Sequence, residues 1–290
     1  MRTWHDVGIA LPYGATGKVR TICPQCSHTR DKPRDACLSI DVDRGLYYCF
    51  YCGWKGGLSG HETYEHRFVT SSPQAPDPNK HDAIRHTWHQ TKRMTAGDPV
   101  YTYLYRRGLI CNDTTTLPAV LRYHPSLKYW DDNHHWTRHP AMLARVDNPQ
   151  GQVVSLHRTY LTHDGRKANV PNPKKLMAPV RPGATKGGAI RLYEATEILG
   201  VAEGIETALA AHLATTVPTW ATLSAIGMEM LHVPKAVRQV IIFADHDRAG
   251  LKAARALAQR MLLQQRQVKI LTPDTPGMDW ADTMENTHDD

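Results

Sequence analysis

The sequence predicts an α/β protein. We expect an open, mostly parallel sheet at its C-terminal end, preceded by a mixed α+β region and a small all-β module. Three observations predict this fold class. Two C-x-x-C pairs lie near the N-terminus, strand and helix patterns alternate from residue 197 onward, and short strands and loops fill the region between. At 290 residues, the chain is long enough for about two domains.

Changes in composition divide the chain further. Residues 1–60 are rich in cysteine, glycine and aromatic residues, and residues 61–80 are rich in serine and proline with little to bury, as in a linker. We expect residues 81–195 to form a basic subdomain and residues 196–290 the parallel-sheet domain. No apolar run is long enough to span a membrane, and the N-terminus does not resemble a secretory signal, so we expect a cytoplasmic protein that does not bind membranes.

The N-terminal two-thirds of the chain contains the less regular elements. Residues 37–43 and 45–52 alternate as two strands would, and residues 81–107 have helical character that ends at Gly108. The clearest strand in this part is Gln152–Leu161, with a turn at Asp164-Gly165.

The C-terminal third predicts a regular alternation. Strands are expected at residues 197–202, 218–223, 239–244 and 267–272, and helices at residues 205–214 and 249–265. The run Gln239–Ala244 is continuously apolar, which suits a buried parallel strand. Because ligands bind at the carboxyl ends of such strands, we expect the functional residues there.

Four cysteines have the spacing of a zinc site. Cys23 and Cys26 form one C-x-x-C pair, and Cys49 and Cys52 form the other, with 22 residues between the pairs. Two such pairs supply the four thiolates that tetrahedral zinc requires, which predicts a zinc ribbon with a closed, structural ion. Cys37 and Cys111 lie outside the pairs and are interpreted as small buried hydrophobic residues.

The net charge of +7 is unevenly distributed. From Glu197 to the C-terminus there are 8 Lys and Arg and 12 Asp and Glu, a net charge of −4, so the rest of the chain carries +11. A basic region of this size favours a nucleic acid partner, although solvated surface charge is the simpler alternative. In the ribbon, aromatic residues interleaved with basic ones suit stacking on single-stranded bases, although some must pack its small core.

Acidic residues follow three of the apolar segments in the C-terminal domain. Glu203 follows the first strand, and the pair Asp245 and Asp247 follows the buried strand. Asp279 and Asp282 come after the last strand. Such a cluster needs cations to stay ionised, and oxygen ligands favour Mg²⁺ or Mn²⁺. Taken singly, each acid has a simpler role as a helix cap or surface residue, and Asp247 in particular can cap the next helix.

These acidic segments resemble the motifs of a Toprim domain. They read V-A-E-G-I-E-T-A-L at 201–209, F-A-D-H-D-R-A-G at 243–250 and G-M-D-W-A-D at 277–282. With a zinc ribbon in front, the order resembles DNA primases of the bacterial replicative type. Residues 140–193 are similar to the subgroup of phages, plasmids and other mobile elements, and Y-L-Y-R-R-G-L at 103–109 is similar to the helix that opens the primase core.

The resemblance implies roles for individual acids. Glu203 matches a metal ligand and general base, Asp245 and Asp247 match the D-x-D metal ligands, and Asp279 matches the first acid of the last motif. Two departures leave other roles open. Bacterial primases usually have aspartate where this chain has Thr207, with Glu206 one position earlier, and their last motif is usually D-P-D, which leaves Glu206 and Asp282 as possible additional ligands.

The resemblance also implies that basic residues of the middle region contact template or nucleotide. The candidates are His157, Arg158, Lys167, Lys174, Lys175 and Arg191. Arg158 is the first choice, because it lies on a predicted strand and can reach a phosphate.

The implied function is synthesis of short RNA primers on single-stranded DNA from ribonucleoside triphosphates, with structural zinc and catalytic Mg²⁺ or Mn²⁺. A separate replicative helicase is a possible partner. A Toprim nuclease is one alternative, although the chain has no P-loop sequence of the ATPase domain such nucleases usually carry. A non-catalytic single-stranded DNA-binding accessory protein is the other.

Overall fold

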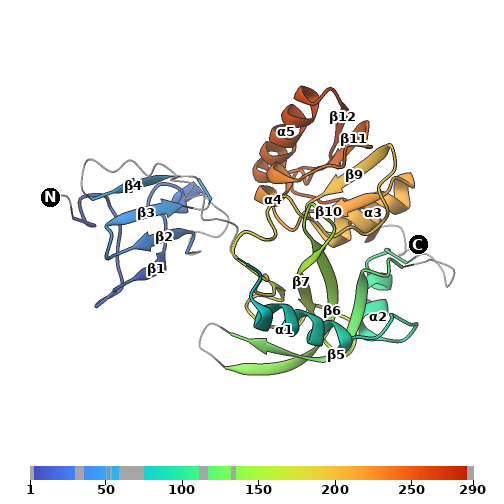
Figure 1. Cartoon of the computed structure of the whole chain (residues 1–290), viewed down its shortest axis with the longest axis horizontal. Helices are drawn as coiled ribbons and strands as arrows, with labels where there is room; N and C mark the ends of the chain where they lie inside the picture. The colour runs from blue at the N-terminus through green and yellow to red at the C-terminus, as the bar shows by residue number, and fades with distance from the viewer. Residues whose placement is uncertain are drawn as a thin grey trace. The chain divides into compact units, whose positions relative to one another are not determined.

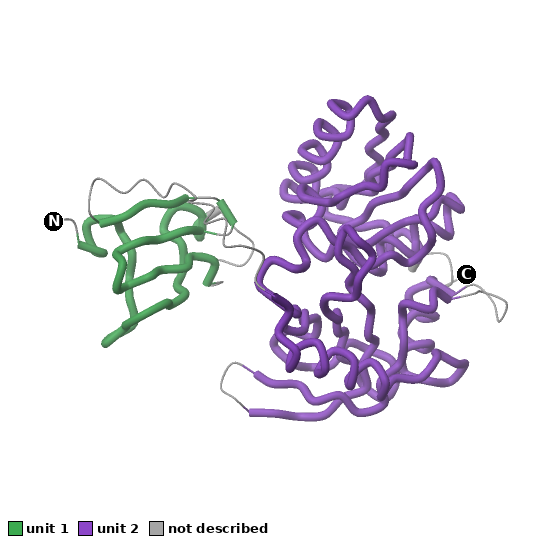
Figure 2. The backbone as a smooth tube through the Cα atoms, in the orientation of Figure 1, with its two compact units in different colours: residues 1–73 green, residues 74–290 purple. Residues whose placement is uncertain are grey.

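The computed structural model describes residues 3–29, 36–49, 51–52, 54–58, 75–110, 117–131 and 135–285. The chain forms two compact units, Met1–Pro73 and Gln74–Asp290 (Figure 2). Residues 59–74, most of the predicted linker, lie outside the described residues, and so does Cys111.

The first unit is a small antiparallel sheet. Its strands are β1 (Lys18–Thr21), β2 (Leu38–Asp41), β3 (Leu46–Cys49) and β4 (Lys55–Gly57), paired in that order, with a 3-10 turn at Ser27–Thr29. The two strands predicted after Cys37 are confirmed as β2 and β3. The core contains buried cysteines beside Leu38, Ile40 and Tyr47, so sulfur atoms make up much of the interior of this unit.

The second unit begins with two helices and an antiparallel sheet (Figure 1). Helix α1 spans Pro78–His89 and α2 spans Pro99–Arg106. Both begin with an aspartate cap followed by proline at the first helical position, a combination that favours helix initiation. The strands β5 (Leu121–Trp130), β6 (Trp136–Asp147), β7 (Val153–Tyr160) and β8 (Lys174–Leu176) pair in sequence order.

The parallel sheet follows. Its strands are β9 (Ile198–Ala202), β10 (Thr219–Ala221), β11 (Gln239–Phe243) and β12 (Gln267–Leu271), in the order β10-β9-β11-β12. All their pairings are parallel, as the alternation predicted. The helices are α3 (Ile205–Thr215), α4 (Ala225–Met230), α5 (Arg248–Leu263) and the short α6 (Asp282–Glu285).

Two hydrophobic cores cover opposite faces of this parallel sheet. On one face, residues of α4 and α5 such as Met228 and Leu257 pack with Val240 and Leu199. On the other face, α3 packs with Phe243 and with residues from α2 and β6. Because that second core is continuous, it packs the antiparallel sheet against the parallel sheet and holds the two in a defined position. Within the described residues, no helix combines the length and apolar composition needed to cross a bilayer.

Candidate functional site

Four thiols converge in the first unit. The ligand atoms of Cys23, Cys26, Cys49 and Cys52 all lie within 4.8 Å of one another. The Sγ atoms of Cys23 and Cys52 are 3.8 Å apart, and those of Cys26 and Cys49 are 3.7 Å apart. A tetrahedral zinc ion with Zn–S bonds of 2.3 Å places its sulfurs about 3.8 Å from one another. The donor set and its spacing therefore fit one zinc ion.

The aromatic residues of the first unit divide between the core and the surface. Tyr47 is buried, and its ring lies 4.4 Å from that of Trp54 and 6.4 Å from that of Trp4. Tyr51, between the second pair of cysteines, is 48% exposed. Phe50 and the basic residues 30–34 lie outside the described residues. Tyr13 and Tyr51 are therefore the exposed aromatic residues among those described in this unit, and Tyr51 is the one beside the cysteines.

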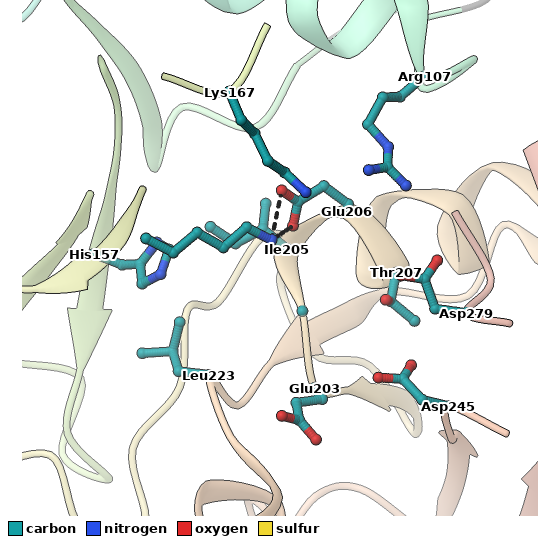
Figure 3. A pocket seen from close by; sticks show the side chains of 12 residues that line it. Arg107, His157, Lys167, Glu203, Ile205, Glu206, Thr207, Leu223, Asp245 and Asp279 are labelled. Carbon is teal, nitrogen blue, oxygen red and sulfur yellow. Dashed lines mark hydrogen bonds and ion pairs between the residues drawn. The ribbon is translucent and has the colours of Figure 1, made fainter. Parts of the chain in front are cut away.

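In the second unit, a cavity of about 220 Å³ opens at the carboxyl ends of the parallel strands. Glu203 follows β9, Asp245 follows β11 and Asp279 lies in the segment after β12, and all three line it (Figure 3). This arrangement arises because parallel strands end at the same edge of the sheet. Glu203 is also held in place by its surroundings, since the Ala225 backbone N–H bonds to its carboxylate.

Asp245 is the most perturbed of these acids. Burial, together with the negative charges of Glu203 and Asp279, raises the pKa of Asp245 from 3.8 to about 7. One of its oxygens, Oδ1, is buried and has no hydrogen-bond partner among the described residues. Burial and the charge of Asp247 also raise the pKa of Glu203. An unpartnered oxygen and two raised carboxyl pKa values fit a site for a divalent cation.

The carboxylates are more loosely grouped than the thiols. The donor atoms of the four cysteines all lie within 4.8 Å of one another, whereas no three of the described carboxylates form such a group. The carboxylates surround a cavity instead, with space between them for cations and a ligand.

The facing wall of the cavity is basic. Four basic residues line it: Arg107, which directly follows α2, His157 of β7, Lys167 between β7 and β8, and Lys174 at the start of β8. Figure 3 shows the ends of Arg107 and Lys167 near Glu206, across the cavity from Glu203 and Asp245. Burial beside the charge of Lys174 lowers the pKa of Lys167. Burial lowers the pKa of His157 to about 4, so this side chain is neutral at pH 7.

Glu206 belongs to the basic wall rather than to the group of acids. It lies in the first turn of α3, is 4% exposed, and accepts hydrogen bonds from Lys174 Nζ at 2.9 Å and from the Tyr103 hydroxyl at 2.7 Å. Burial alone would raise its pKa, but Lys174 and Tyr103 outweigh burial and hold the pKa of Glu206 at about 2. Glu206 is therefore an ionised partner of Lys174.

Two family models match the second unit, and the boundary between them lies between the antiparallel and the parallel sheet. Residues 198–290 match the Toprim domain. The C-terminal domain is a Toprim domain. Residues 78–187, which include the antiparallel sheet, match a domain of unknown function, DUF7146. No curated protein matches the chain in sequence.

The chain is also similar to solved primase structures. A DNA primase domain from Pseudomonas aeruginosa is 17% identical, with a TM-score of 0.47, over 72% of this chain and 74% of that one. The zinc-binding and RNA polymerase domains of the Aquifex aeolicus primase are 16% identical, with a TM-score of 0.42, over 96% and 78%. The primase fragment of the bacteriophage T7 primase-helicase is 14% identical, with a TM-score of 0.42, over 93% and 95%.

Two predicted metal ligands of the Toprim domain do not line the cavity. Asp247 caps α5, where its Oδ1 accepts a hydrogen bond of 2.7 Å from the Gly250 N–H. Asp282 pairs with Arg107 at 3.3 Å, and its other oxygen accepts the Asp279 N–H at 3.0 Å. Both residues border the site, and their negative charges contribute to the raised pKa of Asp245.

Strand register separates the predicted basic residues in front of the Toprim domain. On β7 and β8, Arg158 pairs with Lys175, and both side chains project from the face opposite His157 and Lys174. Arg158 lies over the Tyr160 ring and donates to the Leu176 carbonyl oxygen at 3.1 Å. Neither Arg158 nor Lys175 lines the cavity.

Arg191 likewise lies outside the cavity lining. It donates to the backbone oxygens of Asn148 and Pro149 and lies over the Trp220 ring. These contacts connect the segment before the Toprim domain to the β6–β7 turn.

Sequence reasoning named neither Tyr103 nor Arg107 individually, although both belong to the 103–109 motif that it singled out.

A further surface that sequence reasoning missed lies on the β5–β6 hairpin. Lys128 pairs with Arg138, and Trp130 pairs with Trp136, so all four side chains share one face, here called the tryptophan patch. Lys128 Nζ lies 4.2 Å and 4.3 Å from the centres of the two indole rings, which are 45% and 52% exposed. On β6 this is the face that also carries Met142, in the core shared with the Toprim domain.

Proposed function

We propose that the chain is a DNA primase that joins ribonucleotides on a single-stranded DNA template. The observation that carries the proposal is the cavity with two opposite walls. One wall contains the carboxylates of Glu203, Asp245 and Asp279, and burial together with the charges of the other two raises the pKa of Asp245. The other wall contains Arg107, Lys167 and Lys174. Phosphoryl transfer from a nucleoside triphosphate needs both, because cations neutralise the phosphate oxygens and carboxylates hold divalent ions beside them.

The carboxylate wall would hold Mg²⁺ or Mn²⁺ through Glu203, Asp245 and Asp279. When bound, such ions polarise phosphate oxygens and acidify an attacking hydroxyl. The charge of Asp247 lies close enough to raise the pKa of Asp245, while its Oδ1 caps α5. Asp247 would therefore add negative charge beside the metal site. Glu203, held by the Ala225 N–H, would keep its orientation as substrate enters.

The basic wall would bind and orient the triphosphate. Lys174 is fixed by Glu206, so its ammonium group would reach phosphate without first losing rotamer freedom. Lys167 has a lowered pKa, and a bound anion would favour its charged form. Neutral His157 would donate or accept a hydrogen bond instead of adding charge.

The template would follow the face of the antiparallel sheet that carries His157, Lys174 and the tryptophan patch. The tryptophan patch combines two exposed indole rings with two cations, the combination that stacks bases and neutralises backbone phosphates. In the first unit, we propose a structural zinc ion at the four cysteines and a role in template contact through exposed Tyr51. A primase role implies a cytoplasmic location and access to a replicative helicase, and membership of the phage or plasmid subgroup stays a prediction from the sequence.

Primer synthesis by the purified full-length chain tests this proposal. Single-stranded templates of varied sequence, labelled ribonucleotides and Mg²⁺ or Mn²⁺ should yield short, template-dependent products. Asp245→Asn should abolish them, and Asp274→Asn, at an exposed aspartate of the same domain, should not. Template shortening without synthesis would instead indicate a nuclease, since the acids can serve either reaction. Tight binding with neither reaction would indicate an accessory protein.

A further inference from the structure

The first unit contains a fifth thiol beside the four predicted zinc ligands. Cys37 immediately precedes β2 and is buried, with 7% exposure. Its Sγ lies 3.8 Å from that of Cys26 and 3.6 Å from that of Cys49. Sequence reasoning assigned Cys37 to the hydrophobic core, because it belongs to neither C-x-x-C pair. In the structure it does lie in that core, but it contacts two of the four metal-ligand candidates.

The distances to Cys37 are those between ligands of a single zinc ion. A zinc–thiolate tetrahedron has edges of about 3.8 Å. The Cys26–Cys49 separation is 3.7 Å, so Cys26, Cys37 and Cys49 form a triangle in which every side is close to that length. Burial raises the pKa of the Cys37 thiol, and a hydrogen bond from the Cys23 backbone N–H to its sulfur opposes that effect.

Cys52 differs from the other four thiols in its exposure. Cys23, Cys26, Cys37 and Cys49 are buried in one core, whereas Cys52 is exposed. Water, oxidants and alkylating reagents reach Cys52 first, and its bond to zinc is the one most open to exchange. A buried thiol next to two of the remaining ligands is well placed to replace it.

We propose that Cys37 is an alternative zinc ligand that takes the place of Cys52. In the exchange, the bond from zinc to the Cys52 sulfur breaks and the bond to the Cys37 sulfur forms. The Cys37 thiol loses its proton and the released Cys52 thiolate gains one, so the charge is conserved and no redox reagent is needed. Cys23, Cys26 and Cys49 stay bound throughout. The site then keeps four thiolates when Cys52 is modified or pulled away.

Cobalt substitution of the full-length chain tests the exchange, because the intensity of sulfur-to-cobalt charge-transfer absorption counts bound thiolates. The inference rests on the proposed zinc site, and wild type tests that site separately by showing four thiolates. Cys37→Ser should also show four. Cys52→Ser should show four, with Cys37 supplying the fourth, and Cys37→Ser/Cys52→Ser should show three or bind no metal.

Zinc affinity, measured by chelator competition, provides a second readout that does not depend on activity. Cys52→Ser should stay within about tenfold of wild type, and the double variant should be weaker by about a hundredfold or more. If Cys52→Ser shows three thiolates, or loses zinc as fully as the double variant, Cys37 is a packing residue and the inference is wrong. Wild type without bound metal would instead overturn the zinc site itself.

Discussion

Lys174 Nζ lies 2.9 Å from each of the two carboxylate oxygens of Glu206. The pair connects β8 of the antiparallel sheet to the first turn of α3 in the Toprim domain. Tyr103, from α2, donates a third hydrogen bond to the same carboxylate. The side-chain hydrogen-bond partners of Glu206 therefore come from the basic wall of the cavity and from α2 beside it. Its negative charge orients Lys174 and does not join the group of three carboxylates on the opposite wall.

Loss of Lys174 should destabilise the protein. Lys174→Met leaves the buried Glu206 carboxylate with the Tyr103 hydroxyl as its remaining side-chain donor in the described contacts, and should lower the free energy of unfolding by about 2–4 kcal/mol. Urea denaturation of the full-length chain measures this, with Lys235→Met at an exposed position as the control. Lys174→Met/Glu206→Met should regain most of the loss. A loss no larger than that of the control would show that the pair contributes little.

Asp245 should make metal-free stability depend on pH. Its folded pKa of about 7 lies above the ordinary 3.8, so its favourable contribution is complete below pH 4 and is lost as the pH rises through 7. At about 1.4 kcal/mol for each of the roughly three pKa units, Asp245→Asn should be more stable than wild type at pH 8 by roughly 4 kcal/mol, and the difference should shrink toward pH 4. Urea titrations with a chelator present provide the measurement. A difference that is constant with pH would contradict the raised pKa.

Asp279 and Asp282 should differ in their importance for primer synthesis. Asp279 lines the cavity, so Asp279→Asn should lower the rate by about a hundredfold or more. Asp282 pairs with Arg107 and accepts the Asp279 N–H, so Asp282→Asn should cost about tenfold or less. Rates at saturating and limiting Mg²⁺ distinguish the two residues, because a metal ligand changes the Mg²⁺ requirement. Equal losses with equal shifts in that requirement would make Asp282 a ligand as well.

The tryptophan patch should contribute to binding of single-stranded DNA. Trp136→Ala removes a 52% exposed indole ring that stacks with Lys128, and should weaken binding by about tenfold. Leu263→Ala, at an 80% exposed residue of α5, serves as the control for loss of surface apolar area. Fluorescence anisotropy with a labelled oligonucleotide measures both. Unchanged affinity in Trp136→Ala would remove this hairpin from the template path.

Much of the fold was predictable because its signals are local. The C-x-x-C spacing indicated the cysteine cluster, and the continuous apolar run at 239–244 predicted the central parallel strand, observed as Gln239–Phe243. The helix predicted at 249–265 is observed as Arg248–Leu263, because Asp247 caps it one residue earlier. Helix α4 was not predicted, since its six residues are too few to show a helical period.

The site was only partly predictable. The sequence by itself determined which acids follow the parallel strands, because chain order and strand pattern place Glu203, Asp245 and Asp279 at one sheet edge. Tertiary structure decided which charges meet. A shift of one residue along a strand moves a side chain to the opposite face, so register puts Lys174 in the cavity and Arg158 outside it. The contacts of Glu206 with Lys174 and of Cys37 with Cys26 likewise join residues that are distant in sequence. Tertiary packing brings these groups together, and no local sequence pattern indicates it.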